Sequence, residues 1–143
     1  MQPTGIKLCK VPRILIVEDD ISQRQLMVKL IRTAFDCEIL EASDGLEALM
    51  IMLQNKQTPD LVLLDLIMPC MNGVEFLKIV RDRPEFNHIP VVVCSSVVET
   101  KEIREVMSGW IHGYLVKPIN KEKLLVKLLA ALHDIAVRVD YQY

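Results

Sequence analysis

The segment Leu61-Val62-Leu63-Leu64-Asp65 places four apolar residues directly before an aspartate. A short, wholly apolar run is typical of a strand that is covered on both faces, as in the middle of a parallel sheet. A solvated surface role fits an aspartate in this place poorly, because a charge at the end of a buried strand usually marks a site. Asp65 is therefore the first candidate functional residue.

Four more runs along the chain are predicted as strands, and stretches of helical periodicity separate them. This alternation indicates β-α units around a parallel sheet. With right-handed crossovers, five such units form a doubly wound α/β fold, (βα)5, for which 2-1-3-4-5 is the common strand order. The predicted strands are Arg13–Val17, Glu38–Ala42, Leu61–Leu64, Val91–Cys94 and Tyr114–Val116.

Capping signals mark the starts of the predicted helices. Asp20, Asp44 and Ser96 each stand three residues before a glutamine or glutamate, which is the spacing of a capping box or a close variant. Asn72 and Asn120 are expected to cap the third and fifth helices. The apolar residues expected on one face of the first and fifth helices are Leu26, Leu30, Ile31 and Ala34, and Leu124, Leu125, Leu128, Leu129 and Leu132.

The composition is that of one globular domain. The chain has 143 residues, 51% of them hydrophobic and 25% charged, and a formal net charge of -2, which gives no general attraction to nucleic acid or to an anionic membrane. The apolar runs are strand-sized, and Met1 to Lys10 lack the apolar core of a signal peptide, so we expect a cytoplasmic protein. The cysteines form no C-x-x-C pair and are expected to be free thiols: Cys9, Cys37, Cys70 and Cys94.

Polar residues follow four of the predicted strands. In a doubly wound sheet, ligands bind beyond the carboxyl ends of the strands, near the switch point between the first and third strands. Clustered carboxylates favour a hard divalent cation such as Mg²⁺, and a carboxylate can itself take up a phosphoryl group. A lysine and a hydroxyl at the same edge could each bind a phosphoryl oxygen. The residues concerned are Glu18-Asp19-Asp20, Asp65, Cys94-Ser95-Ser96 and Lys117-Pro118.

Two pairs of neighbours compete for roles at this edge. The capping position of Asp20 explains that residue, so Glu18 and Asp19 are the expected metal pair. Ser96 has the same explanation, whereas Ser95 directly ends its strand and is the preferred hydroxyl residue.

Together these motifs resemble the receiver domain of two-component response regulators, which has a flavodoxin-like fold. The resemblance covers about Pro12 to Leu132 and rests on four motifs in order, each at a strand end. They are Ile14-Leu-Ile-Val-Glu-Asp-Asp20, Leu61-Val-Leu-Leu-Asp-Leu-Ile-Met-Pro69 with Met71-Asn-Gly73, Pro90-Val-Val-Val-Cys-Ser95, and Gly113-Tyr-Leu-Val-Lys-Pro118. The resemblance implies a signalling switch rather than an enzyme, with Mg²⁺ as cofactor. A histidine kinase or histidine phosphotransfer protein would donate the phosphoryl group.

The resemblance also implies roles for individual residues. Asp65 matches the phosphoacceptor, Lys117 the family's lysine, and Ser95 the hydroxyl residue that moves toward the phosphoryl group. Tyr114 matches the aromatic switch residue, and the Lys117-Pro118 bond matches one that is cis in the family. The implied metal ligands are Glu18 (through water), Asp19, Asp65 and the main-chain carbonyl of Ile67.

The same resemblance sets the expected domain organisation and partner surface. We expect an N-terminal extension over 1-11, a receiver domain over 12-136, and a C-terminal tail over 137-143 that is a candidate extension of the fifth helix. A downstream partner or a homodimer is expected on the face made by the fourth helix, the fifth strand and the fifth helix. Trp110-Ile111 stands beside that face where the family most often has Gly-Ala, which suggests either a modified partner surface or local packing.

Two apolar residues, Ile67 and Val97, stand two positions after Asp65 and Ser95. In the family that the chain resembles, these two positions influence how fast the phosphoryl group is lost. The side chains of Ile67 and Val97 cannot orient a hydrolytic water, so we expect slow loss of the phosphoryl group.

Two other functional classes share parts of the pattern. A haloacid-dehalogenase-type hydrolase also uses a strand-end aspartate and Mg²⁺, but it needs a second acid where Ile67 stands. A nucleotide-binding Rossmann-type module needs a glycine-rich turn where Glu18-Asp19-Asp20 would repel phosphates. The segment after the fifth helix is too short for a DNA-reading domain, so no direct contact with nucleic acid is expected.

Overall fold

A computed structural model of the chain describes residues 2–8, 10–54, 58–133 and 136–142. Five strands form a parallel sheet in the order β3-β2-β4-β5-β6, which is the predicted order 2-1-3-4-5 counted along these five strands. Its strands are β2 (Arg13–Val17), β3 (Glu38–Ala42), β4 (Leu61–Leu64), β5 (Val91–Ser95) and β6 (Gly113–Val116). The helices are α1 (Ile21–Arg32), α2 (Gly45–Leu53), α3 (Gly73–Asp82), α4 (Lys101–Val106) and α5 (Lys121–Ala131).

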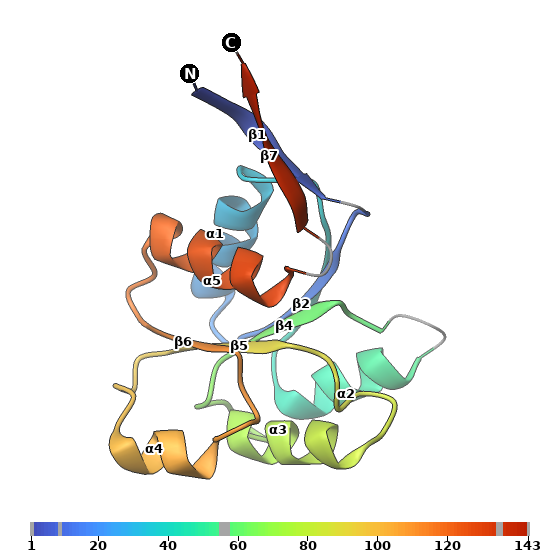
Figure 1. The fold of residues 1–143 in the computed structure, drawn as a ribbon. Helices are drawn as coiled ribbons and strands as arrows, with labels where there is room; N and C mark the ends of the chain where they lie inside the picture. Colours follow the sequence, from blue (N-terminus) through green and yellow to red (C-terminus); the bar gives the residue numbers. More distant parts are fainter. Residues whose placement is uncertain (1, 9, 55–57, 134–135, 143) are drawn as a thin grey trace.

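The helices cover both faces of this sheet, with α1 and α5 on one side and α2, α3 and α4 on the other (Figure 1). The central strands are buried except for Arg13 at the start of β2, because alternate residues of each strand enter opposite core layers. On β4, Leu61 and Leu63 pack in the layer under α1 and α5, whereas Val62 and Leu64 pack in the other layer. This two-sided burial accounts for the uninterrupted apolar run before Asp65.

Four of the predicted helix caps are confirmed. Asp20, Asp44, Asn72 and Asn120 each accept a hydrogen bond from the main-chain N–H three residues on, at 2.8–3.0 Å. The prediction that Ser96 caps the fourth helix is wrong, because α4 begins at Lys101 and Thr100 is its cap, accepting from the N–H of Ile103 at 3.2 Å.

The expected apolar face of the first helix is only partly buried. Met27 and Ile31 are the buried residues of α1, whereas Leu26 is exposed. In α5 the buried residues are Leu124 and Leu128, with Leu132 buried at the end of the helix.

The two ends of the chain form a second, two-stranded sheet that the sequence did not predict. β1 (Gln2–Leu8) pairs antiparallel with β7 (Ala136–Gln142), with Ile6 opposite Val139. Figure 1 shows this ribbon beyond α1 and α5, with the N- and C-termini side by side. The suggested helical extension over the tail is therefore wrong for Ala136–Gln142. This segment alternates apolar and polar residues with the period of a strand, and it finds a partner strand at the opposite end of the chain.

Candidate phosphoryl-acceptor and metal site

The site lies where β2, β4, β5 and β6 end side by side. Val17 and Leu64 are partners in the parallel register, so the residues that follow them, Glu18 and Asp65, are neighbours. The main-chain N–H of Asp65 donates to the carbonyl of Val17 at 3.0 Å, which fixes the start of the loop after β4. Lys117 follows β6, and its N–H donates to the carbonyl of Ser95 at 2.8 Å. The sheet thus brings residues from distant parts of the sequence to one edge.

Three carboxylates converge at this edge. Glu18, Asp19 and Asp65 each offer an oxygen, and these oxygens lie within 4.8 Å of one another; they are the one group of three or more potential metal-ligating side chains among the described residues. Glu18 is fully buried and Asp65 nearly so, whereas Asp19 is exposed. The Oε2 atom of Glu18 is buried without a hydrogen-bond partner among the described residues. An unsatisfied buried carboxylate oxygen beside two other acids fits a hard divalent cation.

Lys117 bridges two of these acids. Its Nζ donates a short hydrogen bond to Oε1 of Glu18 and a second one, of 3.2 Å, to Oδ2 of Asp65. Burial raises the pKa of Glu18 to about 8, the Asp65 carboxylate adds to this shift by accepting a hydrogen bond from protonated Glu18, and Lys117 partly offsets it. Burial alone would lower the pKa of Lys117, but its contacts with Glu18 and Asp65 raise it overall, so the lysine stays charged. One lysine does not offset the cost of keeping both buried carboxyl groups charged, so Glu18 holds a proton more readily than an ordinary glutamate does, and a divalent cation would compete with that proton.

A serine and a tyrosine meet at the loop after β5. Ser95 is fully buried, and its Oγ accepts a hydrogen bond from the N–H of Val97 at 3.2 Å. Tyr114, on β6, donates its hydroxyl to the carbonyl of Val97 at 2.5 Å. The main chain of Val97 therefore connects the two side chains. The neighbouring Ser96 is exposed and belongs to this loop.

The loop after β4 is held close to the site by α3. The N–H of Ile67 donates to Oδ1 of Asp65 at 3.3 Å, and the N–H of Gly73 donates to the carbonyl of Leu66 at 2.9 Å. Ile67 itself is 61% exposed. Cys70 lies in the same loop with a positive φ of 64°. The Lys117-Pro118 peptide bond, which follows β6, is cis.

Other residues singled out in the sequence lie outside the contacts just described. Asp20 caps α1 and does not belong to the group of three acids. Cys37, Cys70 and Cys94 are free thiols as expected, and Cys9 lies outside the described residues. Trp110 packs against the core, and its carbonyl accepts two hydrogen bonds from Arg81, at 2.9 and 2.6 Å, so local packing accounts for its position.

Arg24, in α1, contacts the main chain of the acidic pair but carries no signal in the sequence. Its Nη1 donates to the main-chain carbonyl of Glu18, and its Nε donates to Glu41 on β3. No residue pattern marks such a contact, because one of its acceptors belongs to the main chain.

Comparison with known proteins agrees with this geometry. The family model described as "Response regulator receiver domain" matches residues 14–129. The chain is 35% identical over 116 residues to chemotaxis protein CheY-3 of Vibrio cholerae, covering 81% of this chain and 88% of that protein. It is 30% identical over 124 residues to the polar-differentiation response regulator DivK of Brucella anthropi, covering 85% and 96%. It also matches the sensor histidine kinase TmoS of Ectopseudomonas mendocina at 35% identity, but spans only 12% of that longer protein.

Solved structures show the same fold. The chemotaxis response regulator CheY4 of Vibrio cholerae superposes with a TM-score of 0.77 at 32% identity, covering 86% of this chain and all of that one. The Mn²⁺-bound form of response regulator Rcp1 superposes with a TM-score of 0.71 at 27% identity, covering 91% and 99%. None of the helices in the described part of the chain is long and apolar enough to cross a bilayer.

The doubly wound sheet and its strand-end acids define a phosphoacceptor signalling module rather than an enzyme of the usual kind. The chain belongs to the response regulator receiver domains of two-component systems.

Proposed function

We propose that Asp65 is the residue that accepts the phosphoryl group, in a reaction that depends on Mg²⁺. The observation that supports this most directly is the position of Asp65, nearly buried between Glu18, Asp19 and Lys117. A carboxylate oxygen of Asp65 would form the new P–O bond while the P–N bond of a phosphohistidine donor breaks. Such a transfer needs positioning and neutralisation of charge more than it needs acid–base groups.

The metal ligands proposed are Glu18, through water, Asp19, Asp65 and the main-chain carbonyl of Ile67. The unpartnered Oε2 of Glu18 and the grouping of the three acids support a divalent cation there. When bound, Mg²⁺ supplies positive charge next to the phosphoryl oxygens. Among the relatives, the structure of Rcp1 is described as its Mn²⁺-bound form.

Lys117 would supply the second positive charge. An ammonium has three donor hydrogens, and Lys117 already donates to Glu18 and Asp65. A small shift of this side chain would give a phosphoryl oxygen on Asp65 one of these hydrogen bonds.

Ser95 and Tyr114 would form the switch. If the Oγ of Ser95 turns toward a phosphoryl oxygen, it gives up the N–H of Val97, and the carbonyl of Val97 is the acceptor that Tyr114 uses. Phosphorylation would thereby shift the equilibrium between two positions of the loop after β5 and of the tyrosine.

The output surface proposed is the face made by α4, β6 and α5, for a downstream protein or a second copy of the chain. A cavity of about 560 Å³ lies along β6 and the start of α5, and Tyr114 is among its lining residues. Val116 and Val126 also line it and are 43% and 66% exposed. An apolar surface next to the switch tyrosine supports this choice of face.

The remaining parts of the proposal concern the donor, the lifetime and the domain limits. The donor would be a histidine kinase or a histidine phosphotransfer protein, acting in the cytoplasm. The apolar Ile67 and Val97 would make the phosphorylated state slow to hydrolyse. The receiver domain would span 12–136, with 1–11 and 137–143 as extensions.

The test is incubation of the chain with a small-molecule phosphodonor such as acetyl phosphate, with and without Mg²⁺. Intact-mass analysis should show one added phosphoryl group with Mg²⁺ and none in Asp65→Asn. Asp20→Asn is the matched control, because it removes one acid next to the site while asparagine keeps the cap of α1. Phosphorylation of Asp65→Asn, or of the wild type without Mg²⁺, would refute the proposal.

A further inference from the structure

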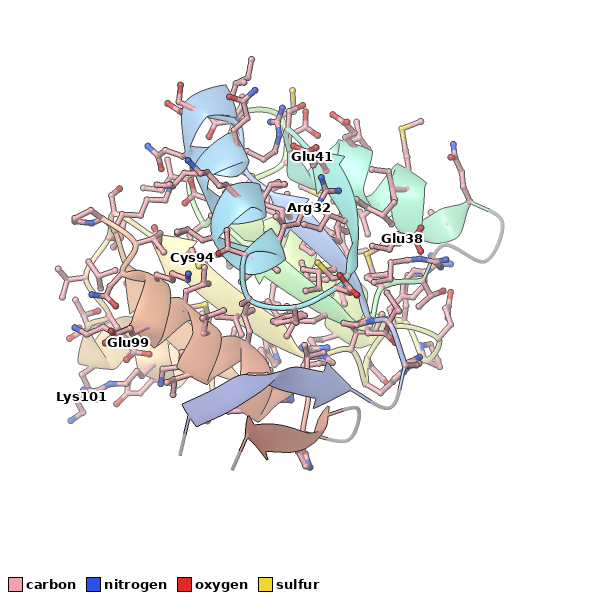
Figure 2. All side chains as sticks on the ribbon, turned by 90° about the horizontal axis from the view of Figure 1, so that it is seen from above. Arg32, Glu38, Glu41, Cys94, Glu99 and Lys101 are labelled. Carbon is pink, nitrogen blue, oxygen red and sulfur yellow. The ribbon has the colours of Figure 1, made fainter. Side chains whose placement is uncertain are left out.

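Arg24 ties the start of α1 to the peptide that carries the acidic pair. Its Nη1 donates to the main-chain carbonyl of Glu18 at 2.7 Å, and its Nε donates to Oε1 of Glu41 at 3.0 Å. The Arg24 side chain is only 17% exposed. Figure 2 shows Glu41 on β3, the edge strand beside α1. The guanidinium therefore connects the end of β2 with α1 and β3.

This contact fixes a specific peptide unit. The N–H of Glu18 donates to the carbonyl of Ala42 at 3.0 Å, and its carboxylate accepts from Lys117. Arg24 holds the remaining polar group, the carbonyl of Glu18, which belongs to the same planar peptide as the N–H of Asp19. The direction in which Asp19 leaves the backbone follows from the orientation of this plane.

The position of the Asp19 carboxylate depends on the backbone more than the positions of the Glu18 and Asp65 carboxylates do. Glu18 and Asp65 are enclosed by core residues and contacted by Lys117, whereas Asp19 is exposed. An exposed carboxylate has rotamers that the surroundings do not restrict, so the position of its Cα and Cβ decides how well it faces the other acids.

We propose that Arg24 is a positioning residue for the divalent cation, because it orients the peptide from which the Asp19 carboxylate reaches the metal. The inference rests on the proposed function, since it concerns the same acids. Groups that orient metal ligands without touching the metal typically change metal affinity 10–100-fold when they are replaced.

Electrostatic attraction alone predicts the opposite change in metal affinity when Arg24 is replaced. Arg24 carries a positive charge next to the main chain of the acidic pair, so its removal leaves the site more negative and should tighten the binding of a cation. A positioning role instead predicts weaker binding when the charge is removed. The direction of the change therefore separates the two.

The probe is Mn²⁺, whose free concentration is measured by electron paramagnetic resonance during titration of the full chain. Arg24→Gln should raise the Mn²⁺ dissociation constant roughly tenfold. Arg24→Lys keeps the charge but lacks the planar fork that reaches two acceptors, so it should also weaken binding. Arg32→Gln is the matched control, because it removes the same charge from an exposed position at the end of the same helix, and its dissociation constant should stay within about twofold of the wild-type value.

Unchanged or tighter Mn²⁺ binding in Arg24→Gln would overturn the inference, and so would equal weakening in Arg32→Gln. Thermal unfolding without metal shows whether each variant is folded at the temperature of the titration. If Arg24→Gln does not fold, Glu41→Gln carries the test, because it weakens the anchor of Arg24 and should raise the dissociation constant by a smaller factor. Phosphorylation of the wild type at Asp65 is measured separately, so failure of the proposed function is distinguishable from failure of the role of Arg24.

Discussion

Gly73 begins α3 where the helix presses against the loop that carries the phosphoacceptor candidate. A Cβ at this position would lie 2.3 Å from the main-chain oxygen of Asp65 and 2.7 Å from the Cα of Leu66. Both are main-chain atoms, which cannot rotate away as the end of a side chain can. The N–H of Gly73 also donates to the carbonyl of Leu66, so the start of the helix cannot retreat without losing this bond.

These contacts set the sign and size of the effect of Gly73→Ala. Helix propensity alone would make the change stabilising by about 1 kcal/mol. The clash reverses this, because the contact falls about 0.7 Å short of the 3.0 Å that real Cβ atoms keep, and overpacking of this kind costs about 1–3 kcal/mol. With two main-chain atoms in the way, we take the upper end of that cost, about 3 kcal/mol, which leaves a net loss of roughly 2 kcal/mol in the free energy of unfolding after the gain from helix propensity. Phosphorylation should slow as well, because the displaced atoms belong to Asp65 and its neighbour.

Urea denaturation of a series of glycine variants tests the reasoning. At Gly45 a Cβ would lie 2.9 Å from the main-chain oxygen of Met71, so Gly45→Ala should lose less stability than Gly73→Ala. At Gly113 the nearest atom is 3.2 Å away, at Cδ of the flexible Lys127, so Gly113→Ala should be almost neutral and serves as the control. A Gly73→Ala variant as stable as the wild type, or a loss in Gly113→Ala as large as that in Gly73→Ala, would refute the steric argument.

Three further predictions concern the remainder of the described structure. Burial lowers the pKa of His112, whose Nδ1 accepts a hydrogen bond from the N–H of Val91 at 3.3 Å. The contribution of neutral His112 to stability is therefore present above the ordinary pKa of histidine and is lost as the pH falls through the lowered pKa. In chemical denaturation at several pH values, His112→Asn should abolish this part of the acid sensitivity, and an unchanged pH profile would contradict the prediction. Ile67→Asn should shorten the lifetime of the phosphorylated protein after removal of the donor, and equal decay of variant and wild type would exclude a role for the apolar side chain. Asn72→Ala should lower the free energy of unfolding by about 1 kcal/mol because it removes the cap of α3. Asn72→Asp, measured alongside, should keep most of the wild-type free energy of unfolding, because aspartate also caps helices.

The parts of the fold that follow from local pattern could be predicted from the sequence. The central strands were found because their residues are buried on both faces. The topology alone then brought Glu18 and Asp65, which follow two of these strands, beside Lys117, which follows the edge strand β6. The start of α4 was misplaced because Ser96 has the spacing of a cap. In the structure Ser96 lies in the loop after β5, and the helix begins only after Thr100.

Features that depend on contacts between distant parts of the chain could not be predicted. The pairing of β1 with β7 joins opposite ends of the sequence, and neither segment forms a sheet alone. The contact of Arg24 with the carbonyl of Glu18 involves a group that every residue carries, so no sequence pattern identifies it. Leu26 was expected on the apolar face of the first helix, but the periodicity of a helix does not define the edges of the buried stripe to within one residue.

The link between Ser95 and Tyr114 passes through the N–H and the carbonyl of Val97 and uses no atom of its side chain. Any amino acid at position 97 can make these two hydrogen bonds except proline, which has no N–H to donate. In the proposed switch, the side chain at position 97 is therefore free to vary without loss of the two main-chain hydrogen bonds that join Ser95 and Tyr114. In an alignment of relatives, the serine and the tyrosine would then covary with each other, whereas the residue at position 97, which joins them, would vary independently of both.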